Sequence, residues 1–137
     1  MVRRVALAAA CLAALIIMPL RDEPVIIQML IDHGAGVNER NNNGLDALMV
    51  ASFLGHIKIV DTLLANHADV HASAKDGQTA LMRAARQGHR DVVQRLIEEG
   101  ADIGAQNNHG DTAITWAQKY DHHEVVELLQ TAESEQH

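Results

Sequence analysis

Residue types that commonly build reactive sites are scarce in this chain of 137 residues, which carries one cysteine and only one each of Phe, Trp and Tyr. A single cysteine excludes a disulfide within the chain. Cys11 lies in an apolar stretch that disfavours the thiolate, so it is a poor nucleophile. The formal net charge of −7 argues against a nucleic-acid partner. With so few aromatic residues, the predicted core is aliphatic.

The most informative feature that is present is a period of 33 residues. Gly44, Gly77 and Gly110 follow this spacing, and a long segment recurs around each of them. The apolar columns of the period are Leu48, Leu81 and Ile114; Ala51, Ala84 and Ala117; Val60, Val93 and Val126; and Leu63, Leu96 and Leu129. A fixed period of this size indicates a stack of similar supersecondary units. Such a stack usually offers an extended surface and rarely a catalytic pocket.

Within each unit the apolar spacing predicts two short helices, over about 80–87 and 91–98 in the middle unit. Gly88 separates these helices, and Gly100 follows the second, where a left-handed C-cap is expected. Thr79 stands at the entrance to the first helix, a natural capping position. Extended fingers with turns are predicted between units.

Three positions depart from their columns. His67 occupies the column of Gly100, and Asp121 occupies that of Gly88. Asp46 stands where the other units have Thr. A positive φ is tolerable for His but costs free energy, so we expect His67 to be a strained position.

These units resemble the ankyrin repeat, whose period is 33 residues. The segment GQTALMRAARQGH keeps the family's signature at Gly77, Thr79, Leu81, Ala84, Ala85, Gly88 and His89. Ala80 replaces the family's Pro, and Met82 replaces its first His. The resemblance covers about residues 24–132, with a partial repeat over 24–40 and further repeats over 41–73, 74–106 and 107–137. The first and last repeats are atypical, as expected of terminal caps.

The resemblance implies an all-α solenoid of stacked helix-turn-helix units joined by β-hairpin or turn fingers. Family members generally bind proteins without catalysis, through the finger tips and the exposed face of the first helix. It therefore implies a monomeric, non-catalytic protein–protein interaction module with no cofactor. The alternative is a regulatory or structural subunit of a larger enzyme or complex, with the chemistry on another chain.

Phasing the residues against the repeat places all three aromatic residues on the presumed concave face. Arg83 and Arg86 share this face, and we expect them to meet acidic groups of a protein or peptide while the aromatic rings provide apolar anchors. The alternative is that Trp116 and Tyr120 close the core of the last repeat. The candidate partner-binding residues are Phe53, Lys75, Asp76, Gln78, Arg83, Arg86, Trp116, Lys119 and Tyr120.

The nine histidines raise the possibility of a metal-binding site, but the 33-residue period argues against one. His56, His89 and His122 recur every 33 residues after the inter-helix position, so we interpret them as framework residues. No histidine spacing resembles a closed structural metal site. No glycine-rich phosphate loop is present, because each glycine has a turn role. The sequence therefore predicts no metal site and no catalytic residue.

The N-terminal segment, residues 1–23, does not follow the period. Arg3 and Arg4 precede an apolar run from Val5 to Met18, the signature of a secretory signal. This run is short for a membrane span. We favour an exported, periplasmic or membrane-anchored protein, in which residues 5–18 alone would contact a membrane. The alternative is a cytoplasmic protein in which this segment caps the stack, although Pro19 would interrupt the in-register helix.

Overall fold

The computed structural model describes residues 22–135 as a row of paired helices. The seven helices in this range are α2 (Pro24–Asp32), α3 (Ala47–Leu54), α4 (Ile57–Ala65), α5 (Ala80–Gln87), α6 (Arg90–Glu98), α7 (Ala113–Lys119) and α8 (His123–Glu135). The predicted second helix of the first repeat, both helices of the middle repeat and the all-α class are confirmed. The predicted signal or capping segment falls almost wholly in residues 1–21, outside the described residues.

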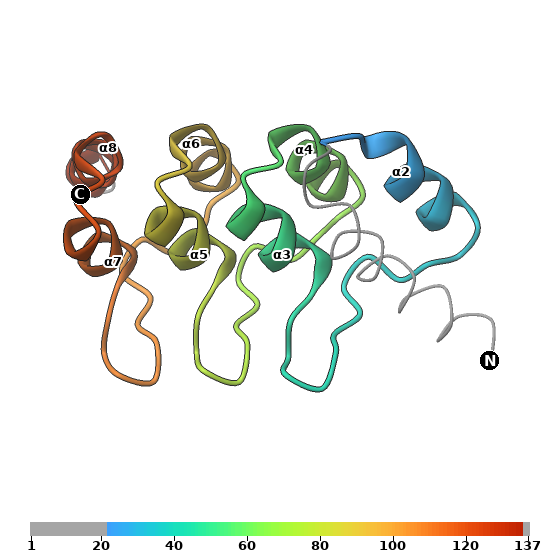
Figure 1. Ribbon diagram of the computed structural model, residues 1–137, viewed down its shortest axis with the longest axis horizontal. Coiled ribbons are helices and arrows are strands. Elements are labelled where there is room, and N and C mark those ends of the chain that lie inside the picture. Colours follow the sequence, from blue (N-terminus) through green and yellow to red (C-terminus); the bar gives the residue numbers. More distant parts are fainter. Residues whose placement is uncertain (1–21, 136–137) are drawn as a thin grey trace.

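The helices form two rows, with the connecting loops projecting below them (Figure 1). One row holds the first helix of each repeat, α3, α5 and α7, and the other holds α2, α4, α6 and α8 (Figure 1). Each first helix packs against its own second helix and against a neighbouring first helix. A residue at a given repeat position therefore faces the same side in every unit, and the period acts as a ruler for the surface.

The first helices begin at side-chain caps that the sequence encodes. Thr79 Oγ1 accepts from the backbone N–H of Met82 at 3.3 Å. Thr112 and Thr115 form a reciprocal capping box at the start of α7. Asp46, the departure in this column, fills the same position, and its carboxylate accepts from Met49 N at 2.9 Å. Each cap satisfies one of the backbone donors that a helix N-terminus leaves unpaired.

The position between the two helices of a repeat, held by Gly88 in the third repeat, is constrained by its backbone conformation and by a neighbouring histidine ring. Gly88 is left-handed at φ 74, and a Cβ there would lie 2.5 Å from His122 Nδ1. The His122 ring also bonds through Nε2 to the carbonyl oxygen of Arg86, at 2.9 Å. His89 makes the same contact with Phe53 O, which confirms that His89 and His122 are framework residues. Each of these histidines joins its repeat to the one before.

The two residues that stand in glycine columns, His67 and Asp121, adopt a glycine-like backbone. His67 has φ 69 and Asp121 has φ 58, the only positive values at non-glycine positions in the described range. Asp121 is acceptable on steric grounds, because no described histidine of a following repeat occupies the space near it. The cost at these positions is therefore mainly backbone strain.

The core is aliphatic, as predicted. Ala51, Ala84 and Ala117 are completely buried where neighbouring first helices approach, and larger side chains there would overpack the contact. The columns of the second helices complete the core with Val60, Val93, Leu63, Leu96 and Leu129, all of them fully buried. Burial of this kind is the main favourable term in folding.

The fingers are turns more than hairpins in residues 22–135. Within that range, the β-pairing expected of hairpin fingers is reduced to an isolated antiparallel bridge between Ser73 and Thr79. Neighbouring fingers are joined instead by bonds such as Lys75 N to Asn43 O, at 3.1 Å, and Asn108 N to Asp76 O, at 3.0 Å. The fingers therefore form a connected row and hold their exposed side chains in a fixed order.

Candidate functional site

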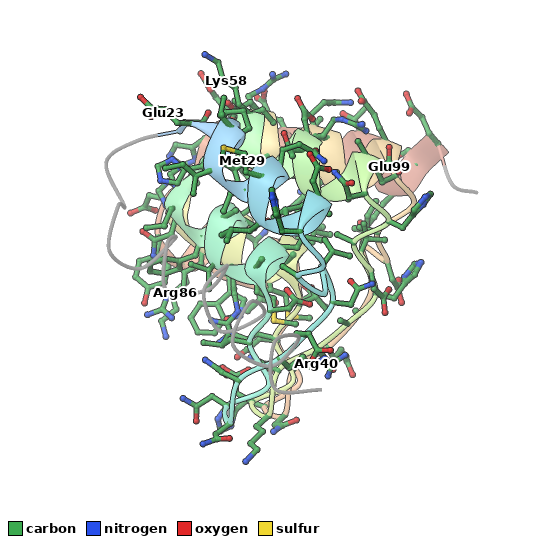
Figure 2. All side chains as sticks on the ribbon, turned by 90° about the vertical axis from the view of Figure 1, so that its right-hand side faces the viewer. Glu23, Met29, Arg40, Lys58, Arg86 and Glu99 are labelled. Atoms are coloured by element: carbon green, nitrogen blue, oxygen red, sulfur yellow. The ribbon has the colours of Figure 1, made fainter. Side chains whose placement is uncertain are left out.

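The candidate face lies on the first-helix row, on the side of the molecule opposite to the acidic Glu99. Figure 2 shows Arg86 and Glu99 pointing outward on opposite sides of the ribbon. The first-helix column of Arg86 contains Phe53 in the preceding repeat and Lys119 in the following one. Because these three positions are equivalent, α3, α5 and α7 present them to the same side.

Trp116 and Tyr120 form an aromatic pair at the last repeat. Their ring centroids are 6.1 Å apart and the rings are stacked at 10°. Tyr120 remains 42% exposed, whereas Trp116 is half-buried and packs against the core. The indole therefore helps close the last repeat and also contributes to the surface, and its role as an anchor for a partner stays a prediction.

Two cations stand beside this pair. The guanidinium carbon of Arg86 lies 5.0 Å from the Trp116 ring centroid and 5.6 Å from that of Tyr120. Lys119 Nζ lies 5.1 Å and 5.9 Å from the same two centroids. These distances fall in the range of cation–π attraction. We name Arg86, Trp116, Lys119 and Tyr120 the cation–aromatic cluster.

Arg83 does not join this cluster as a free cation. Its guanidinium pairs with Asp76 at 3.3 Å, and its side chain is only 15% exposed. Burial lowers the pKa of Arg83, while the neighbouring Asp76 carboxylate opposes that shift. The expectation that Arg83 presents a free charge to a partner is therefore corrected, because its first counter-ion comes from its own repeat.

The expectation for Gln78 is also corrected. It was expected among the exposed finger-tip residues, yet it is 8% exposed, and its backbone carbonyl oxygen accepts from the backbone N–H of Ala74. Lys75 and Asp76 are exposed on the same finger, and the backbone carbonyl of Lys75 accepts from Asn108 Nδ2 at 2.7 Å. The finger therefore contributes Lys75 and Asp76 to the surface, and Gln78 to its internal support.

The α3 end of the face is apolar. Phe53 is 37% exposed, and Val50 and Leu54 beside it are half-buried. We name Val50, Phe53 and Leu54 the apolar zone. No charged side chain occurs between Ala47 and Leu54, whereas α5 carries Arg83 and Arg86 and α7 carries Lys119.

The described residues contain no group of three or more His, Cys, Asp or Glu side chains that could hold a metal ion. Within that same range, no helix combines the length and apolarity that crossing a bilayer requires. The chemistry that the face itself offers is burial of apolar and aromatic surface, together with charge pairing.

A family model described as ankyrin repeats (3 copies) matches residues 6–74 and residues 63–136. The chain belongs to the ankyrin-repeat family. Ankyrin repeats are generally protein-binding modules and are typically non-catalytic. No curated protein matches this chain at a significant level. The repeats therefore establish a protein-binding class of domain, and the particular partner has to be argued from the face itself.

Two features of this ankyrin-repeat surface were missed by sequence reasoning. The first is the position of Lys119 beside the aromatic pair. Helical spacing could have found it, since Trp116, Lys119 and Tyr120 follow an i, i+3, i+4 pattern. The second is that Val25 and Met29 on α2 are exposed. Figure 2 shows the position of Met29 on this helix.

Proposed function

We propose that this chain is a non-catalytic adaptor that grips a protein or peptide segment on the face formed by α3, α5, α7 and the fingers. The observation that carries the proposal is the arrangement of Phe53, Arg86, Trp116, Lys119 and Tyr120 on that face. Aromatic residues and arginine are the residues most enriched at energetic hot spots of protein interfaces. The general protein-binding character of ankyrin repeats supports the same function.

Rigid support strengthens this reading. The Arg86 backbone carbonyl is bonded to His122 and that of Phe53 to His89, so their helix ends are tied to the next repeat. Side chains held on a pre-ordered backbone lose less conformational entropy when a partner binds. The face is therefore suited to binding without a large rearrangement of the first helices.

Capture of a partner from cells that make the protein tests the proposal. Arg86→Glu together with Lys119→Glu should abolish capture, because charge on the face is reversed. Lys58→Glu with Arg90→Glu is the matched control, since both of these cations are exposed on second helices. Thermal melts should be nearly equal for both double variants. A partner captured equally by wild type and by the Arg86/Lys119 variant would refute this face as the binding site.

For residues 1–20 we propose an export or anchor segment, on the basis of Arg3 and Arg4 before the apolar run. The alternative of a capping helix is supported by the family match, which starts at residue 6. The intact mass of the natural protein decides between them. A full-length product recovered from the cytoplasm would refute export.

A further inference from the structure

The cation–aromatic cluster lacks a counter-charge in the described part of the chain. The ion pairs found within residues 22–135 are Arg83–Asp76, Arg95–Asp61 and Arg95–Glu99, and neither Arg86 nor Lys119 takes part in one. The chain as a whole carries a net charge of −7. Acidic residues are therefore abundant, yet among the described ones none forms an ion pair with these two cations.

The acidic surface lies on the other row of helices. Helix α8 exposes Glu124, Glu127, Glu133 and Glu135, and no Lys or Arg occurs within it. Charge is thus segregated between the two rows near the C-terminal end of the stack. A partner approaching the first-helix row meets Arg86 and Lys119, while an acidic partner is repelled from the opposite surface.

The aromatic rings make the two cations better suited to binding an anion. Each cation lies beside both rings, which shield one side of it from water and limit its rotamers. A carboxylate that reaches either cation can form charge-assisted hydrogen bonds, the stronger class of hydrogen bond. Two cations at one aromatic pair therefore favour a ligand carboxylate over a neutral polar group.

The apolar zone lies one repeat away, because Phe53 occupies the same column as Arg86. Packed helices stand about 8–10 Å apart. An extended chain advances about 3.3 Å for each residue. A peptide running along the stack would therefore pass from Phe53 to the α5 position in about three residues.

We propose that the face recognises an extended peptide segment of an acidic protein, in which a Glu or Asp and a bulky apolar residue are about three positions apart. The carboxylate binds Arg86 and Lys119, and the apolar side chain covers Phe53 and Val50. This inference rests on the proposed protein-binding function and adds the chemistry and spacing of the partner.

Selection from a displayed library of random nine-residue peptides, with the full chain as bait, tests the spacing. Wild type should enrich peptides with a carboxylate three positions from Leu, Ile, Phe or Met. Each selected peptide is then titrated while the fluorescence of Trp116, the single tryptophan, is followed. Arg86→Gln with Lys119→Gln should weaken binding at least about tenfold. Lys58→Gln with Arg90→Gln, the matched control, should bind like wild type.

The outcomes separate the inference from the proposed function. Enriched apolar peptides without carboxylates, whose binding is lost in Phe53→Ala, would overturn the acidic specificity and leave the proposed function standing. Peptides whose binding neither the Phe53 variant nor the Arg86/Lys119 variant changes would overturn both. A library that yields no enriched peptide overturns the inference alone, because a folded partner could still bind. Phosphoserine in place of the selected Glu should not bind more tightly, and a tenfold gain would overturn the choice of carboxylate.

Discussion

The third and the last repeat place the same sequence columns in different surroundings. In α5, Met82 and Ala85 are buried between neighbouring first helices. Their equivalents in α7, Thr115 and Gln118, are exposed. Helix α7 packs against α5 and α8, and within the described residues it has no first helix beyond it. Polar residues in the outward columns are therefore what allows the stack to end in water.

The inward columns do not change between these repeats. Ala84 and Ala117 are both completely buried, as are Leu96 and Leu129. The concave column does change, from Arg83 in the third repeat to Trp116 in the last. The inward columns are set by packing, and the outward columns by the position of the repeat in the stack. Under the proposed function, the concave columns are set by a partner.

The largest effect should come from truncating the shared leucine column. Leu96→Ala should destabilise the protein by about 2–5 kcal/mol, because the side chain is fully buried and leaves a cavity. Leu129→Ala should cost less, since a terminal repeat is held by a single neighbouring interface. Urea denaturation of the two variants measures the difference. Equal losses would show that the last repeat is as strongly coupled as an internal one.

A smaller effect is expected at the inter-helix position, where the same two repeats differ. Gly88→Ala should cost about 1–2 kcal/mol from backbone strain, and more from contact of the new Cβ with the His122 ring. Asp121→Gly should be neutral or stabilising, because that position is already left-handed and no described histidine packs on it. Thermal melts compare the two. A tolerated Gly88→Ala would mean that the His122 ring moves away at little cost.

The stack could be predicted from the sequence because its rules are local and repeated. An evident physical reason fixes the residue type at Gly88, at Thr79 and in the Ala84 column. The same reason applies again in each unit of the period. The site was harder to predict. The pairing of Arg83 with Asp76 depends on rotamers, for which the columns give no direct signal. The position of Arg86 over Trp116 depends on a contact across repeats, whereas helical spacing alone could have placed Lys119 beside Trp116. Gln78 is buried by the way the finger folds back, which the period alone does not specify.

The caps of the first helices provide a pH-dependent comparison. Burial raises the pKa of Asp46 above its ordinary value, whereas Thr79 caps the equivalent helix without a charge. A raised folded-state pKa means that the contribution of Asp46 to stability is fully present at pH below its unfolded pKa. That contribution is lost as pH rises through the folded pKa. Asp46→Thr should therefore gain stability relative to wild type as the pH rises from the unfolded pKa of Asp46 through its folded pKa.

Melting temperatures of wild type and Asp46→Thr at several pH values measure this gain. Thr79→Ser, which keeps a neutral cap, is the control, and its difference from wild type should not vary with pH. A constant difference for Asp46→Thr would show that the desolvation of Asp46 is fully offset by its bond to Met49 N.

The smallest effect should come from the second-helix exit, where the second and third repeats differ. His67 and Gly100 occupy the same column, and both backbones are left-handed, at φ 69 and φ 89. A side chain costs about 1–2 kcal/mol in this region, while glycine gives back part of that gain through its greater freedom in the unfolded chain. His67→Gly should therefore raise the melting temperature by a few degrees, as read in a thermal melt. An unchanged or lower midpoint would show that the exposed imidazole contributes contacts worth at least the strain of its backbone.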